Sequence, residues 1–208
     1  MHTKNIITAG LAVNEAQKAL VMIHGRGGSA EDILSLAPHL AVQDFALLAP
    51  QASGNSWYPN SFLAAPERNE PWLTGALNVL KSVTEDLQQQ GITAEQTYFL
   101  GFSQGACLML EFITRNATRY GGAAAFTGGL IGDRIYPENY KGDFNGTPIF
   151  IGSSNPDMHV PVERVYATAN ILQDKHAKVI LKVYDNMGHT INQDELGQVN
   201  KHIFGTVE

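Results

Sequence analysis

The sequence has little of what several protein classes depend on. Its single cysteine, Cys107, cannot form an internal disulfide, and no Cys/His cluster has the spacing of a zinc site. Charged residues make up only 16% of the 208 residues, the net charge is -6, and no run of Lys or Arg occurs. Nucleic acid and anionic membranes are therefore not expected partners, because both are bound through clustered positive charge.

Long apolar runs and targeting signals are missing as well. No run approaches the roughly 20 residues of a membrane span. The N-terminus leads into no signal-peptide core of the right length, and a lone thiol fits a reducing compartment. We therefore expect a cytoplasmic protein with no stable membrane association, no metal and no cofactor, which is a monomer or a weak homodimer.

What remains is a globular composition with 44% hydrophobic residues and no repeat, linker or low-complexity tract. This predicts one domain over residues 1–208. Short runs that are apolar on both faces alternate with helix-like segments, which predicts an α/β fold with a mostly parallel sheet and helices on both faces. The predicted strands are Ala19–His24, Phe45–Pro50, Thr97–Phe102, Ala123–Thr127, Pro148–Gly152 and Val179–Tyr184, and the predicted helices are Ala30–Leu40, Trp72–Gln90, Gln104–Arg115, Val162–His176 and Asn192–Phe204.

One long irregular stretch, residues 51–71, interrupts this alternation. It contains Trp57, Tyr58 and Phe62 together with several prolines. Loops of this length are uncommon in compact domains and are often functional. We interpret the three aromatics as the lining of a substrate pocket; the alternative is a surface excursion packed by its own side chains.

The clearest chemical signal is Gly101-Phe102-Ser103-Gln104-Gly105, which matches the G-x-S-x-G pattern. Alone the pattern is weak. Here it stands between a predicted strand and a predicted helix, where a sharp turn exposes the serine and the two glycines let strand and helix approach. Ser103 is therefore the candidate nucleophile, and an ordinary strand-to-helix turn is the alternative.

A serine hydroxyl needs a base to act as a nucleophile. His189 follows the last predicted strand, which places it at the same sheet edge as Ser103. The acid is expected between these two residues in chain order. Asp157, close behind its strand, is favoured over Asp133, which lies further from its own strand end. Two further loop carboxylates, Asp143 and Asp185, are interpreted as surface residues.

The negative charge that develops on an attacked ester requires two backbone donors. The amide of Gln104 begins a helix, and the amide of Arg26 lies in the glycine-rich turn after the first predicted strand. These two residues are the candidate oxyanion hole. His24 is expected to anchor that turn, His159 is a less favoured base, and Cys107 is expected to pack as a small buried side chain.

Together these residues resemble the phospholipase/carboxylesterase family, whose members include the acyl-protein thioesterases. The resemblance implies a compact α/β-hydrolase fold without a large lid, ester or thioester hydrolysis, and no cofactor. It matches the family's nucleophile, acid and base to Ser103, Asp157 and His189, and its oxyanion donors to Arg26 and Gln104. It rests on His24-Gly25-x-Gly27, the Gly101–Gly105 elbow, Asp157-x-x-Val160-Pro161 and Gly188-His189.

Three departures from the family pattern bear on the substrate. Arg26 stands where an apolar residue is usual, Gly28 stands where aspartate is usual, and the aromatic loop reads Trp57-Tyr58-Pro59-Asn60. We expect small or short-chain esters, with a polar or anionic group that the Arg26 side chain contacts. For that side chain, a solvent-facing position is the alternative.

Three other functions stay open. The first is hydrolysis of long acyl chains, as by a lysophospholipase or an acyl-protein thioesterase. The second is a dienelactone-hydrolase-like lactonase, although such enzymes carry cysteine at the position of Ser103. The third is a hydrolase relative that only binds a small molecule, although such proteins typically lose a residue of the triad.

Overall fold

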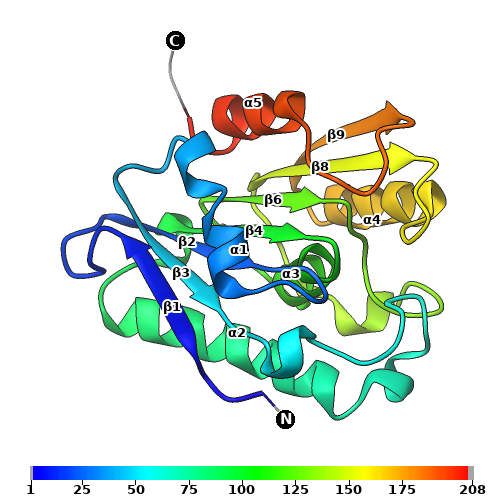
Figure 1. Cartoon of the computed structure of the whole chain (residues 1–208), viewed down its shortest axis with the longest axis horizontal. Helices are drawn as coiled ribbons and strands as arrows, with labels where there is room; N and C mark the ends of the chain where they lie inside the picture. Colours follow the sequence, from blue (N-terminus) through cyan, green and yellow to red (C-terminus); the bar gives the residue numbers. More distant parts are fainter. Residues whose placement is uncertain (1, 206–208) are drawn as a thin grey trace.

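A seven-stranded sheet forms the centre of the molecule in the computed structural model, which describes residues 2–205 (Figure 1). The strand order is β1-β3-β2-β4-β6-β8-β9. Only β1 runs antiparallel to its neighbour, β3, and all other pairs are parallel. The strands are β1 (Ile6–Gly10), β2 (Lys18–Ile23), β3 (Phe45–Pro50), β4 (Thr97–Phe102), β6 (Gly122–Phe126), β8 (Pro148–Asn155) and β9 (Lys178–Asp185).

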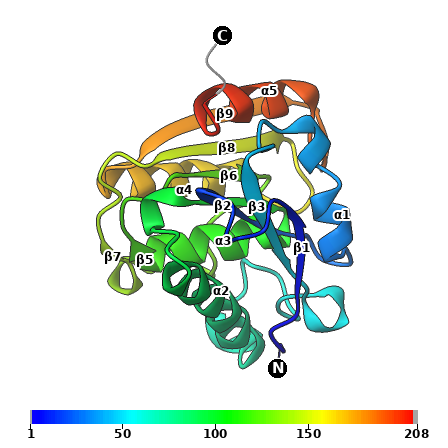
Figure 2. The same cartoon turned by 90° about the vertical axis from the view of Figure 1, so that its left-hand side faces the viewer.

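Helices cover both faces of the sheet, as the alternating pattern predicts (Figure 2). One face packs against α2 (Trp72–Gln89), α3 (Gln104–Arg115) and α4 (Val162–Asp174). The other face packs against α1 (Ala30–Leu34) and α5 (Gln193–His202). A separate two-stranded sheet joins β5 (Asn116–Ala117) to β7 (Lys141–Gly142).

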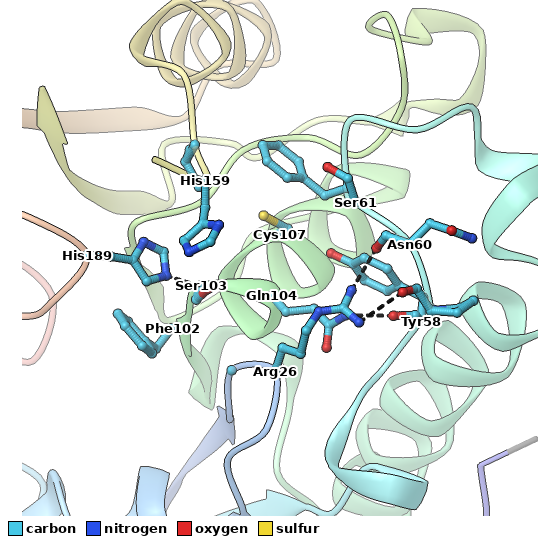
Figure 3. A pocket seen from close by; sticks show the side chains of 14 residues that line it. Arg26, Tyr58, Asn60, Ser61, Phe102, Ser103, Gln104, Cys107, His159 and His189 are labelled. Carbon is cyan, nitrogen blue, oxygen red and sulfur yellow. Dashed lines mark hydrogen bonds between the residues drawn. The ribbon is translucent and has the colours of Figure 1, made fainter. Parts of the chain in front are cut away.

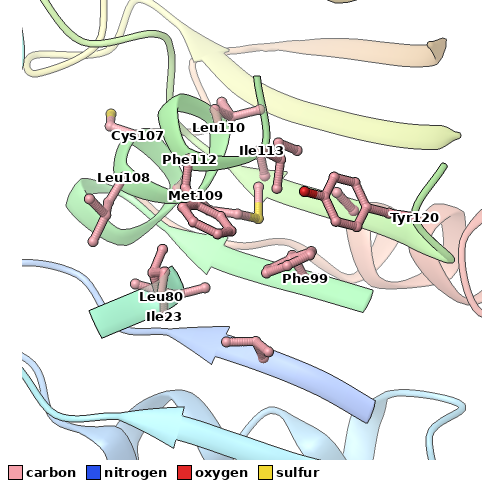
Figure 4. Close-up of a cluster of buried hydrophobic side chains, with 14 of the residues drawn as sticks. Ile23, Leu80, Phe99, Cys107, Leu108, Met109, Leu110, Phe112, Ile113 and Tyr120 are labelled. Carbon is pink, nitrogen blue, oxygen red and sulfur yellow. The ribbon is translucent and has the colours of Figure 1, made fainter. Parts of the chain in front are cut away.

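The helix α3 is buried along almost its whole length. Its first eleven residues, from Gln104 to Thr114, are all buried. They pack between β4 and α2 against side chains such as Ile23, Leu80 and Phe99 (Figure 4). A fully enclosed helix is held rigidly, because movement of any side chain would open a cavity in a close-packed interior. The residue before this helix is therefore fixed in position relative to the sheet.

Two predictions of secondary structure are corrected. The strand β1 was missed; it is short, lies at the sheet edge, and leaves Thr8, Ala9 and Gly10 exposed, so it carries no clear apolar pattern. The helix predicted over Ala30–Leu40 ends at Leu34, and a 3-10 turn, Ala37–His39, follows it. Pro38 lies in that turn, and a proline cannot continue an α-helical hydrogen-bond ladder.

The loop over residues 51–71 contains two 3-10 turns, Ser53–Asn55 and Pro66–Asn69. Among residues 2–205, no helix has both the length and the apolarity that crossing a bilayer requires.

Candidate active site

Ser103 occupies a strained turn between β4 and α3. Its backbone has φ 54° and ψ -120°, a conformation that side-chain-bearing residues rarely adopt. A methyl group on Gly105 would overlap the carbonyl oxygen of Ile23 in β2, and one on Gly101 would lie 2.6 Å from the oxygen of Gly105. Glycine is therefore required on both sides of the turn, as the elbow motif predicts.

His189 links Ser103 to Asp157. The His189 Nε2 lies 2.8 Å from the Ser103 Oγ, and its Nδ1 lies 2.9 Å from the Asp157 Oδ2. An ionised carboxylate only accepts hydrogen bonds, so Nδ1 carries the proton and Nε2 is free to accept the serine hydroxyl proton. The structure thus brings together the three residues predicted from the sequence, from three separate loops at one sheet edge. Figure 3 shows two of them, Ser103 and His189, beside each other.

The environment of Asp157 keeps it ionised. Its side chain is fully buried, and burial by itself disfavours the charged form. The backbone amides of His159 and Val160 nevertheless donate to Oδ1 at 2.8 and 2.9 Å, and the His189 ring donates to Oδ2. The balance lowers the pKa of Asp157 below its ordinary value. A charged Asp157 can hold the tautomer of His189 described above and stabilise an imidazolium.

The other acidic candidates lie elsewhere. Asp133 is exposed, and its Oδ1 accepts a hydrogen bond from the Tyr136 hydroxyl at 2.6 Å. Asp143 pairs with the ring of His176, and Asp185 is exposed at the end of β9. None of these carboxylates contacts His189, so the geometry agrees with the choice of Asp157 over Asp133.

Arg26 and Gln104, whose backbone amides are the candidate oxyanion donors, line the same cavity as Ser103. Gln104 is the first residue of α3, so its amide has no partner within the helix. Within residues 2–205, the amide of Arg26 donates no hydrogen bond, whereas its neighbour Gly27 donates to the Asn55 carbonyl at 2.7 Å. His24 anchors this turn as expected: its Nε2 accepts from the Ala52 amide and its Nδ1 donates to the Gly25 carbonyl. Burial lowers the pKa of His24, which fits this neutral role.

The exposed side chain of Arg26 is held by the loop of residues 56–60. Its guanidinium donates to the Ser56 hydroxyl at 3.1 Å and to the carbonyls of Pro59 and Asn60 at 3.0 and 2.7 Å. It also lies over the ring of Tyr58, 5.9 Å from the centroid. The loop of residues 56–60 thus folds over the turn and supplies acceptors for the guanidinium. Whether the same side chain also contacts the substrate stays a prediction.

Gln104 binds the same loop through its side chain. Its Oε1 accepts from the Trp57 amide at 2.9 Å, and its Nε2 donates to the Tyr58 carbonyl at 2.8 Å. Both candidate oxyanion residues, Arg26 and Gln104, thus also hold residues 56–60 with their side chains. No local pattern predicts this arrangement, because it depends on two segments that are distant along the chain.

A cavity of about 400 Å³ opens at Ser103. Tyr58 and Phe62 line this cavity, as predicted, and both are buried. Trp57 does not line it. The Trp57 ring instead packs in the core and donates its N–H to the His24 carbonyl at 2.9 Å, so its assignment to the pocket lining is corrected. The remaining lining residues are Gly25, Arg26, Pro59, Asn60, Ser61, Phe102, Ser103, Gln104, Cys107, His159, Val160 and His189.

Two of these lining residues need comment. Cys107 is buried as expected, and burial raises the pKa of its thiol to about 12, so it stays protonated and unreactive. His159 is exposed and packs edge-on against His189, with ring centroids 4.9 Å apart. It does not take the place of His189 as the partner of Ser103. Among residues 2–205, no group of three or more His, Cys, Asp or Glu is arranged to hold a metal ion.

Comparison with known proteins shows which proteins this chain is similar to. The chain is 54% identical to a phospholipase/carboxylesterase from Dyadobacter fermentans, with a TM-score of 0.97 over 98% of this chain and 97% of that one. It is 27% identical to acyl-protein thioesterase 1 of Saccharomyces cerevisiae over 92% of this chain and 94% of the relative. It is 26% identical to the probable carboxylesterase SOBER1-like of Arabidopsis thaliana over 87% and 76% of the two chains.

The family described as phospholipase/carboxylesterase matches residues 11–206, which include every element from β2 to α5. The match therefore spans the elbow, the histidine loop and the glycine-rich turn together. This chain belongs to the phospholipase/carboxylesterase family and is a hydrolase with the α/β-hydrolase fold.

Proposed function

We propose that this protein is a serine esterase that hydrolyses small or short-chain carboxylic esters, and thioesters of the same acids, through an acyl-enzyme on Ser103. The hydrogen-bonded chain from Ser103 through His189 to the buried Asp157 carries the proposal. This is the arrangement that nucleophilic acyl transfer needs, because the base accepts a proton as the nucleophile attacks.

The reaction would run in two halves. The Ser103 Oγ attacks the ester carbon while His189 Nε2 takes its proton, and the amides of Arg26 and Gln104 hold the oxyanion. When the carbon–oxygen bond of the leaving group breaks, His189 returns that proton to the departing oxygen. Water then attacks the acyl-enzyme, His189 accepts its proton, and the free acid leaves with Ser103 restored.

The dimensions of the cavity support the restriction to small acyl groups. Its volume of about 400 Å³ is near the lower end of ligand pockets, which span roughly 300–1,000 Å³. The buried side chains of Tyr58, Phe62 and Cys107 close its inner end, while Asn60 and His159 make its outer wall polar. A long acyl chain would need an apolar groove that extends beyond this wall.

Two measurements test the proposal. A fluorophosphonate probe should label the wild-type protein and fail to label Ser103→Ala, whereas a protein that only binds small molecules would not be labelled at all. A series of nitrophenyl esters from acetate to decanoate then tests size. We expect kcat/KM to peak at two to four carbons. A steady rise through eight carbons, at up to about fourfold per methylene, would instead indicate a preference for long acyl chains.

A further inference from the structure

A second, smaller cavity borders the oxyanion turn. It measures about 250 Å³ and shares Gly25, Arg26 and Phe102 with the cavity that contains Ser103. Figure 3 shows Phe102 beside Ser103 and His189, on the side away from Tyr58. The Phe102 ring contacts that of His189, with centroids 5.3 Å apart. The second cavity therefore adjoins the one at Ser103 along these three residues.

The chemical character of the second cavity differs from that of the first. Its walls are formed largely by four apolar side chains from β4, α1, the segment after α1 and the segment after His189, namely Phe102, Ile33, Leu36 and Ile191. One carboxylate, Asp32, lies at its edge and already accepts a hydrogen bond from the Ser29 amide at 2.8 Å. This lining favours a neutral apolar group and disfavours an anion, because no donor outside the turn faces an added negative charge.

Both cavities open to solvent. Pro59, Ser61 and His159 are exposed in the lining of the first, and Leu36 and Ile191 are only partly buried in that of the second. A group bound in the second cavity can therefore leave to solvent while the acyl group stays bound to Ser103.

We propose that the second cavity binds the alcohol half of the ester, and that the preferred alcohol is small, neutral and apolar. The inference rests on the proposed function. His189 carries the Ser103 proton after the attack and gives it to the alcohol oxygen as the carbon–oxygen bond breaks, so the alcohol must lie beside the His189 ring. Phe102, which contacts that ring, forms one wall of the second cavity.

The test varies the alcohol while the acyl group stays constant. Ethyl, propyl and butyl acetate have leaving groups of similar reactivity but different length. In the wild-type protein, kcat/KM should rise by roughly tenfold from ethyl to butyl acetate, because each buried methylene contributes up to about fourfold. Leu36→Trp fills the cavity and should remove this rise while ethyl acetate is still hydrolysed. Ser35→Trp, one residue away on an exposed side chain outside the lining, is the matched control and should keep it.

The nitrophenyl ester series varies only the acyl half of the substrate, so it distinguishes an effect on that half from an effect on the alcohol half. Leu36→Trp should leave the dependence on acyl length as in the wild-type protein. If the substitution changes the acyl dependence instead, or if the wild-type rate does not depend on alcohol length, the assignment is wrong. Ile191→Ser offers a second variant that adds no volume, and it should flatten the alcohol series in the same way. Failure of the proposed function itself would look different, since the wild-type protein would then hydrolyse none of these esters and take no fluorophosphonate label.

Discussion

Replacing Arg26 by leucine, the apolar type usual in the family, tests whether its side chain serves the loop or the substrate. The substitution removes the donors to Ser56, Pro59 and Asn60 but leaves the Arg26 amide in place. The released carbonyls can bind water because this part of the loop is accessible, so the free energy of unfolding should fall by only about 1 kcal/mol. The loop keeps its bonds to the Gln104 side chain and to the Gly27 amide, which limits how far it can shift.

The effect on catalysis should be larger than the effect on stability. A misplacement of about 1 Å in reacting groups can cost roughly 100-fold in rate. With the remaining anchors in place, we expect kcat to fall by about tenfold, with KM for neutral esters little changed. Nitrophenyl butyrate and nitrophenyl hemisuccinate, which adds a terminal carboxylate, should be slowed by the same factor.

Two controls make this result decisive. Arg26→Lys keeps the charge but cannot bind three acceptors through one planar group. Its kcat should therefore lie between those of the wild type and Arg26→Leu. Arg68→Leu removes an equal charge from the same loop at an exposed position, and it should not change the rate of hydrolysis of either ester. If Arg26→Leu slows only the hemisuccinate ester and raises its KM, the guanidinium binds substrate and the anchoring role is wrong.

Three further predictions follow from the site and its surroundings. Ser103→Ala should fold and lose activity toward the level that the oxyanion amides alone support, up to about a million-fold in a steady-state assay. Asp157→Asn should reduce kcat by up to about ten-thousand-fold, whereas Asp133→Asn, at an exposed position away from His189, should be neutral; a reversed order would refute the choice of acid. Burial raises the pKa of Glu195 to about 7 from its usual 4.5, so this carboxyl destabilises the fold increasingly as the pH rises from 4.5 to about 7. Glu195→Gln should therefore be more stable than the wild type at pH 8, by up to about 3 kcal/mol in urea unfolding, and equal or less stable at pH 4.5; equal stability at pH 8 would contradict the shift.

The features that could be predicted from the sequence are those set by local pattern or by steric necessity. Apolar runs identified the six parallel strands of the sheet; five of them are largely buried, and β9, at the sheet edge, is only partly buried. The elbow was recognisable because only glycine fits at Gly101 and Gly105. The order of Ser103, Asp157 and His189 along the chain indicated which loops meet, since parallel strands end at the same sheet edge.

The features that could not be predicted depend on how distant segments meet. Trp57 was assigned to the pocket, but a loop has no periodicity that shows which side chains face the core. The guanidinium of Arg26 finds its acceptors on a loop 30 or more residues away. The second cavity likewise joins Leu36 to Ile191, which lie near opposite ends of the chain.

The close contact between the elbow and β2 means that positions around the site differ in whether they can accept a different side chain. At Gly101 and Gly105 any added side chain meets backbone atoms of a neighbouring element, which cannot rotate away. Asn60, Leu36 and His159 instead line cavities, which leave space beside their side chains. Substitutions at the cavity-lining positions can therefore change which ester is accepted. The glycines at the turn that presents Ser103 can hardly be replaced at all.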